Sequence, residues 1–153
     1  MEPKDAAKRC LKRYRRLGRE IERLQEQLYR LETGAVDIGL HGLDYSQDRV
    51  QTSPKRGAGF EHLADVKADR EQDVREGIEA CRREQSQIAA AVERINDQTL
   101  RDVLYHTYIA PDSSGLRDAA ELMSYSESRV RQWHEAALRI FAVMNPELLE
   151  QEE

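Results

Sequence analysis

The chain has 153 residues, of which 39% are hydrophobic, 35% charged and 6% aromatic, and its formal net charge is -5. An average soluble domain is about 45–50% apolar and about 25% charged, so this composition argues against a thick core and against a multilayered enzyme. The acidic balance gives the chain as a whole no electrostatic attraction to DNA or to an acidic membrane, although the sum can hide opposite local charges.

The first predicted element is a long helix over residues 4–33. Its apolar residues are separated by 4, 3, 4, 3, 4 and 3 positions: Cys10, Tyr14, Leu17, Ile21, Leu24, Leu28 and Leu31. This spacing is a heptad stripe, and the residues between are mostly good helix formers. The helix therefore has one narrow apolar face that needs a partner.

A second stripe with the same spacing predicts that partner. It consists of Val74, Ile78, Cys81, Gln85, Ile88, Val92 and Ile95. We expect residues 1–96 to form a long antiparallel helical hairpin, or coiled coil, in which the two stripes face each other. Gln85 is the only polar member, and a buried amide in such a stripe more often fixes register or oligomeric state than does chemistry. Heptads alone leave open whether the hairpin closes within one chain or between two copies in a homodimer.

Residues 34–62 are predicted to connect the two helices as a Gly-rich loop. They contain five of the eight glycines and sustain no helical or strand period. A connection of this length is either a functional loop or a mobile linker. The stretch Asp48–Arg56 mixes polar and basic residues and could touch a partner, but its composition favours a solvated linker.

Residues 97–145 are predicted to form a three-helix domain, followed by an acidic tail over residues 146–153. Leu100 to Ile109 reads as the first helix, and Leu116 to Met123 as a second, short one. A polar turn ends at Ser126, a good N-cap for a third helix that continues to Phe141. A short helix, a tight turn and a capped helix with Arg and Gln on its first turns are typical of a helix-turn-helix.

Residues 97–143 resemble region four of bacterial sigma factors. The likeness is carried by the string Ser126 to Leu138, in which a serine cap precedes Arg-Val-Arg-Gln, and by the small residues Ala119 and Ala120 in the preceding helix. With the basic N-terminal helix and the Gly-rich loop, the layout is similar to the RinA- and ArpU-like late-gene regulators of phages and prophages. That resemblance implies an all-α protein that binds promoter double-stranded DNA, with RNA polymerase as a further partner. The chain is too short to be a complete sigma factor.

The charge is unevenly distributed and supplies the candidate contacts. Residues 1–19 carry eight basic and two acidic side chains, whereas residues 97–153 carry five basic and eleven acidic ones. We predict base-edge and phosphate contacts from the helix-turn-helix: Ser126, Ser128, Arg129, Arg131, Gln132 and Arg117. Phosphate contacts are predicted from the N-terminal helix: Lys8, Arg9, Lys12, Arg13 and Arg16. The alternative for this helix is a solvated coiled-coil flank that pairs with acidic residues, and the two interpretations have equal weight.

Other functions have weaker support in the sequence. No nucleophile with its base, paired-carboxylate site, phosphate-binding glycine loop or metal-ligand spacing is present, so we expect no enzyme, no cofactor and no metal, and ordinary roles for His106 and His134. No apolar run reaches the length of a membrane span, and no secretory leader is apparent, so we expect a cytoplasmic protein of a bacterial host, encoded by a phage or prophage. A small-terminase-like DNA-packaging protein and a protein-only interaction module remain as alternatives.

Overall fold

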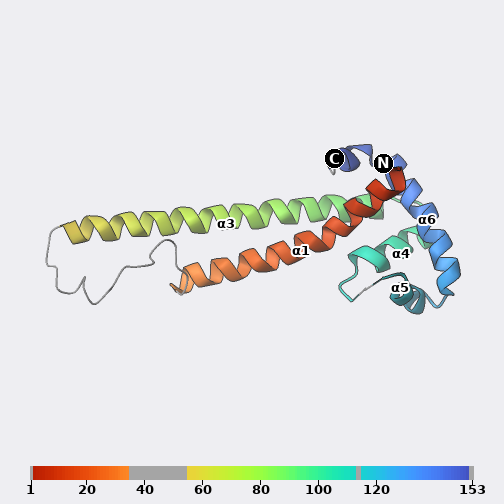
Figure 1. Ribbon diagram of the computed structural model, residues 1–153, viewed down its shortest axis with the longest axis horizontal. Coiled ribbons are helices and arrows are strands. Elements are labelled where there is room, and N and C mark those ends of the chain that lie inside the picture. Colours follow the sequence, from red (N-terminus) through yellow and green to blue (C-terminus); the bar gives the residue numbers. More distant parts are fainter. Residues whose placement is uncertain (1, 35–54, 113–114, 152–153) are drawn as a thin grey trace. The chain divides into compact units, whose positions relative to one another are not determined.

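The computed structural model describes residues 2–34, 55–112 and 115–151 of the chain, with side chains of the second segment from His62 onward. Regular structure in these segments is entirely helical, and no strand occurs among them, which confirms the all-α class. In chain order (Figure 1) the elements are α1 (Pro3–Thr33), α3 (Lys55–Glu93), α4 (Gln98–Leu104), the π-helical turn η1 (Tyr105–Ile109), α5 (Leu116–Met123), α6 (Glu127–Met144) and α7 (Pro146–Glu150). Among the described helices, none has an apolar stretch long enough to cross a lipid bilayer.

The loop prediction for residues 34–62 is wrong at its C-terminal end, because α3 already begins at Lys55. Gly57 and Gly59 each cost a helix about 1 kcal/mol relative to alanine. Each residue added to an existing helix also gains a backbone hydrogen bond without a new nucleation step, so α3 extends through both glycines. Residues 35–54 lie outside the described residues, and with them most of the polar and basic stretch over residues 48–56.

The contacts divide the chain into two compact units. The middle unit comprises residues 20–80, and the terminal unit comprises residues 1–19 together with 81–153. The N-terminal part of α1 and the C-terminal part of α3 thus belong with the helices after residue 97. The domain boundary expected at residues 96–97 does not coincide with this division.

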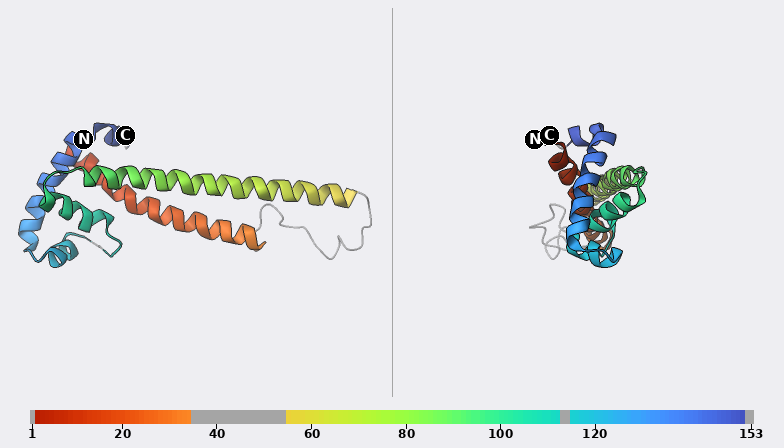
Figure 2. Two further views of the ribbon diagram at one scale, coloured as in Figure 1. Left: turned by 180° about the vertical axis from the view of Figure 1, so that it is seen from behind. Right: turned by 90° about the vertical axis from the view of Figure 1, so that its right-hand side faces the viewer.

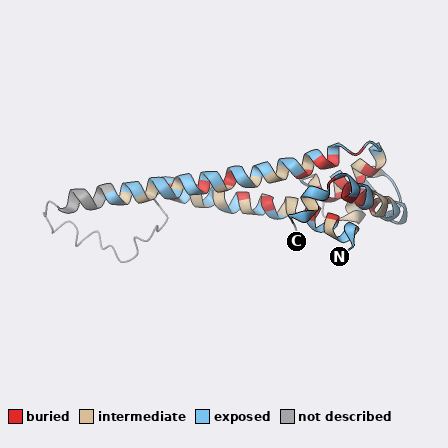
Figure 3. Cartoon of the chain, turned by 90° about the horizontal axis from the view of Figure 1, so that it is seen from above, coloured by how far each residue is buried: buried red, intermediate tan, exposed pale blue. Residues whose placement is uncertain are grey.

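The middle unit consists of the adjoining parts of α1 and α3. The predicted stripe residues Ile21, Leu31, Val74 and Ile78 are buried, as Figure 3 illustrates by colour. A Cβ atom placed on Gly77 would lie 3.3 Å from Cδ1 of Leu24, so the helices approach closely there. The facing stripes bury apolar surface that neither helix could bury alone.

The same pairing of stripes continues in the terminal unit. Nε2 of Gln85 in α3 donates a hydrogen bond to the backbone oxygen of Tyr14 in α1, at 3.0 Å. A Cβ atom on Gly18 would lie 3.2 Å from that Nε2 atom, so the missing side chain leaves room for the amide. The polar member of the second stripe is therefore hydrogen-bonded across the helix pair. Neither Cys10 nor Cys81 is part of a disulfide bond, and Cys10 is buried.

Two apolar clusters hold the rest of the terminal unit. The larger joins the N-terminal turns of α1 to α3, α4 and α6, and its buried members include Leu11, Ile95, Leu104 and Phe141. The smaller joins α4, α5 and α6 through Val103, Ala119, Ala120 and Val130. Trp133 is half-buried and packs against both clusters. Both α4 and α5 contact α6, as can be followed in Figure 2.

The predicted acidic tail over residues 146–153 is wrong for its first five residues, which form α7. Leu148 and Leu149 pack against the larger cluster, and this apolar pair gives the segment a reason to dock. Asn145 precedes α7, is buried, and donates its side-chain amide to the backbone oxygen of Phe141 at 2.9 Å. Residues 152 and 153 lie outside the described part of the chain.

Candidate nucleic-acid interface

The first two turns of α6 present most of the predicted base-reading residues. The Ser126 hydroxyl caps the helix by accepting a hydrogen bond from the backbone N–H of Arg129, at 3.3 Å. All five predicted residues on this segment are exposed: Ser126, Ser128, Arg129, Arg131 and Gln132. The opposite side of the helix is buried at Val130, His134, Ala137, Leu138 and Phe141. The helix therefore holds its polar face outward because its apolar face is part of the core.

Two arginines on this face have neighbours within α6 itself. The Arg131 guanidinium pairs with the Glu127 carboxylate at 3.0 Å. The Arg129 guanidinium lies over the ring of Trp133, with its carbon 5.9 Å from the ring centroid. Each of these contacts stabilises the observed side-chain position by only a few tenths of a kcal/mol. Both groups remain accessible.

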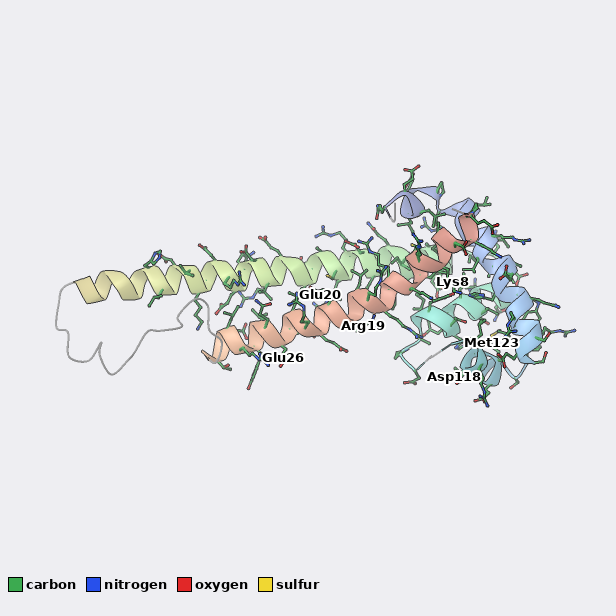
Figure 4. The ribbon with its side chains drawn as sticks, viewed as in Figure 1. Lys8, Arg19, Glu20, Glu26, Asp118 and Met123 are labelled. Carbon is green, nitrogen blue, oxygen red and sulfur yellow. The ribbon has the colours of Figure 1, made fainter. Side chains whose placement is uncertain are left out.

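The sixth predicted residue, Arg117, is exposed on the first turn of α5. Asp118 follows it directly and is labelled in Figure 4. Over α5 and the first two turns of α6, the three arginines at 117, 129 and 131 are matched in number by three carboxylates at 118, 121 and 127. This surface has hydrogen-bonding groups but no net positive charge.

A second surface of the terminal unit is strongly basic. A groove of about 820 Å³ lies along the N-terminal half of α1. Its cationic lining residues are Lys8, Arg9, Lys12, Arg15, Arg16 and Arg19. The remaining lining comes from Thr107, Tyr108, Gly115, Leu116 and His134, and no carboxylate is among the described residues that line it. Figure 4 labels Lys8 and Arg19, which mark the two ends of the basic row.

The structure places four of the five predicted phosphate-binding residues in the groove and one outside it. Lys8, Arg9, Lys12 and Arg16 line the groove. Arg13 does not, and its guanidinium pairs with the Glu84 carboxylate of α3. For Arg13 the geometry fits the alternative of a flank that pairs with an acidic residue.

Sequence reasoning missed two groove residues, Arg15 and Arg19. A signal for them was present: Lys8, Lys12, Arg15 and Arg19 are separated by 4, 3 and 4 positions. This is the same spacing as the apolar stripe, offset onto a neighbouring face of the helix. Cations at heptad spacing share one face, so a charge stripe can be read in the same way as a hydrophobic one.

His134 and Tyr108 form the floor of the groove and are hydrogen-bonded to each other. The Tyr108 hydroxyl oxygen lies 2.7 Å from Nε2 of His134, and both residues are buried. Burial, aided by the positive charge of Lys8, lowers the pKa of His134 to about 4. Burial also raises the pKa of Tyr108 to about 12, against a smaller opposing effect of Arg15. Both groups are therefore neutral near pH 7, and the charge of the groove comes from Lys and Arg.

The π-helical turn η1 brings Thr107 to the groove. The side-chain oxygen of Thr107 is buried, and no hydrogen-bond partner for it is found among the described residues. The backbone oxygen of Thr107 accepts a hydrogen bond from the Arg15 guanidinium, at 2.9 Å. Single π-helical turns are frequent at functional sites, where they re-aim side chains. Here the turn places a buried hydroxyl beside a row of cations.

The N-terminus of α5 also lies at the groove. Gly115 is the N-cap residue of α5, has a φ of +153°, and supplies no side-chain cap. Nothing lies within 4 Å of the position a Cβ atom would take there. The first N–H groups of a helix carry partial positive charge and favour an anion. The helix end and the basic row therefore favour the same kind of ligand.

The chain was compared with models of protein families, with curated protein sequences and with solved structures, and none of these comparisons found a match.

Proposed function

We propose that the protein is a phage-type DNA-binding transcriptional regulator that acts at promoters, together with RNA polymerase, in the cytoplasm of a bacterial host. In this proposal α1 and α3 form an antiparallel coiled hairpin, and the same long helices join two copies of the chain in a homodimer. Helices α4, α5 and α6 form a helix-turn-helix of the sigma region-four kind. The resemblance of residues 97–143 to that region supports this assignment.

One observation carries the proposal: the exposed polar face at the start of α6. Ser128, Arg129, Arg131 and Gln132 project from a helix whose other side is fixed in two apolar clusters. Arg and Gln side chains can make paired hydrogen bonds to guanine and adenine edges in the major groove. Because the surface has no net charge, its contribution is reading bases rather than attracting phosphates.

The proposal is tested by selection from a random duplex library. The protein is incubated with random 20-bp duplexes at 50 mM KCl, bound DNA is recovered and sequenced over several rounds, and an enriched motif is expected. Arg129→Ala/Arg131→Ala should reduce affinity for the enriched sequence by at least tenfold, since each good base contact contributes about 1–3 kcal/mol. Arg82→Ala/Arg83→Ala, which removes two exposed arginines of α3, is the matched control and should change little. Absence of any motif, or an unaffected double variant, contradicts the assignment.

A protein-only interaction module is the second candidate, favoured by an apolar face on the last turns of α6. Ile140, Val143 and Met144 share this face and are 37%, 82% and 43% exposed. Exposed apolar side chains gathered on one face are typical of protein contacts. If the wild-type protein binds no duplex at 50 mM KCl, this candidate replaces the regulator.

A large ring by analytical ultracentrifugation, instead of a monomer or dimer, would favour a DNA-packaging protein of the small-terminase kind.

A further inference from the structure

We propose that the basic groove beside α1 binds the phosphate backbone of duplex DNA, as a contact separate from the base-reading turns of α6. The choice of DNA as the source of the phosphates rests on the proposed function. Two surfaces of the terminal unit then have different roles in binding DNA. The groove supplies sequence-independent affinity, and α6 supplies sequence preference.

The distribution of charge is the first argument. Of the described residues, six cations and no carboxylate line the groove, whereas the α5 and α6 turns carry equal numbers of arginines and carboxylates. A protein that neutralises DNA phosphates releases counterions, and this release supplies most sequence-independent affinity. The overall charge of -5 opposes DNA binding, so a locally positive surface is needed. Within the described part of the terminal unit, the groove has that property.

The length of the basic row favours a nucleic-acid backbone over a free nucleotide. Lys8 and Arg19 are eleven residues apart in α1, which corresponds to about 16 Å at a rise of 1.5 Å per residue. One strand of duplex DNA has a phosphate about every 3.4 Å along the axis, so the row spans roughly five phosphates. The two or three phosphates of a nucleotide would leave part of the row unused.

The floor of the groove gives the site positioned donors in addition to charge. The buried hydroxyl of Thr107 has no partner among the described residues and can donate to a phosphate oxygen. A buried hydroxyl without a hydrogen bond is costly, and a bound phosphate would remove that cost. The N-terminus of α5, where Gly115 supplies no side-chain cap and Asp118 lies in the first turn, contributes backbone N–H groups.

The hydrogen bond from Arg15 to the backbone of η1 fixes the position of the Arg15 side chain in the groove. The guanidinium donates to the Thr107 oxygen, so the side chain is held against the floor of the groove. A guanidinium presents N–H donors in a planar fork whose geometry matches a phosphate. Arg15 is half-buried and is therefore left unchanged in the test below.

The test compares two triple variants of equal charge change. Lys8→Gln/Lys12→Gln/Arg19→Gln removes three exposed cations of the groove, and Arg70→Gln/Arg82→Gln/Arg83→Gln removes three exposed cations of α3. Binding of a fluorescein-labelled 30-bp duplex of arbitrary sequence is followed by anisotropy between 50 and 200 mM KCl. The slope of log K against log salt should fall by about 0.9 for each lost phosphate contact. We expect the groove variant to lose roughly two to three units of slope and about 100-fold in affinity at 100 mM KCl. The control variant should stay within about threefold of wild type.

A third variant tests the floor of the groove without a change of charge. Thr107→Val keeps the shape of the side chain and removes only the hydroxyl, which makes no hydrogen bond in the described structure. It should therefore keep or raise the melting temperature while weakening duplex binding about threefold to tenfold. Unchanged binding by Thr107→Val would overturn the role of the floor. Circular dichroism of all four proteins shows whether each is folded.

The outcomes separate the groove from the proposed function. Equal affinities and slopes for the groove and control variants would overturn the role of the groove in DNA binding. The proposed function would still stand if Arg129→Ala/Arg131→Ala loses affinity for the enriched sequence. No duplex binding by the wild-type protein at 50 mM KCl overturns the function and the DNA assignment together. Sodium tripolyphosphate supplies the other source of phosphate. If it raises the melting temperature of wild type but not of the groove variant, while duplex binding is the same in both, the site binds a small polyphosphate and the DNA proposal is wrong.

Discussion

Lowering the pH from 8 to 5 should destabilise the terminal unit through the protonation of one buried residue, His134. Its side chain is 4% exposed and hydrogen-bonded to the Tyr108 hydroxyl. Burial, with Lys8 nearby, lowers the pKa of His134 from 6.5 to about 4, against a smaller opposing effect of Glu135. In the unfolded chain the imidazole regains its ordinary pKa. Between these two values the unfolded state binds more protons, so stability falls as the pH falls.

The size of the effect follows from the two pKa values. The contribution is fully present above pH 6.5 and is lost progressively as the pH approaches 4. Linkage gives a loss of about 2 kcal/mol at pH 5 and about 3 kcal/mol at pH 4, relative to pH 8. A typical domain is stable by about 5–15 kcal/mol, so this change is readily measured.

The assay is urea unfolding at pH 8 and pH 5, monitored by circular dichroism, for wild type and His134→Gln. Glutamine keeps a side chain that can hydrogen-bond to the Tyr108 hydroxyl but does not titrate. The other titrating groups are shared by both proteins and cancel in the difference. Wild type should lose about 2 kcal/mol more than His134→Gln between the two pH values. Equal losses, or an NMR titration of His134 with a pKa of 6.5 or higher, would refute the reasoning.

Three further changes test the packing and the helix cap. Phe141→Ala should lower the free energy of unfolding by about 3–5 kcal/mol, because the ring is fully buried, whereas Val143→Ala at an 82% exposed position should change it by less than about 0.5 kcal/mol. Urea titrations of both variants check this, and similar values would contradict the core as described. Gly18→Ala improves helix propensity by about 1 kcal/mol but brings a methyl group to 3.2 Å from the Gln85 amide, so we expect little net gain in wild type and the full gain in a Gln85→Ala background. A double-mutant cycle that finds the same effect in both backgrounds would contradict this contact. Ser126→Ala should cost about 1 kcal/mol, since the hydroxyl accepts the Arg129 N–H, and an unchanged thermal melt would show that the cap contributes nothing.

The elements that sequence analysis located best are those with a sustained period. The heptad stripe from Cys10 to Leu31 predicted α1, which ends at Thr33 as expected. Ser126 was recognised as the cap of α6 because a serine before a helical pattern has a local physical effect. Failures occurred where local propensity and final structure disagree: α3 extends through Gly57 and Gly59, and the leucine pair of α7 docks a segment that reads as an acidic tail.

In the candidate site, too, the features with a local sequence pattern were predictable and the others were not. The exposure of Arg129, Arg131 and Gln132 follows from a helical period that buries Val130 and Leu138 instead. The basic groove has no such local signature as a whole. Its cations lie within residues 8–19, its floor and rim come from residues 107–116, and His134 comes from a third region.

The sequence by itself determined the helical class, the two apolar stripes, the capped polar turns of α6 and the concentration of positive charge near the N-terminus. These are local properties, because helix period, capping and charge depend on residues a few positions apart. Only the tertiary structure decided that Arg13 pairs with Glu84 while Arg15 reaches the Thr107 backbone. The residues of these pairs are 71 and 92 positions apart and meet only when apolar burial brings their helices together. That packing alone sets which face of α1 becomes a groove.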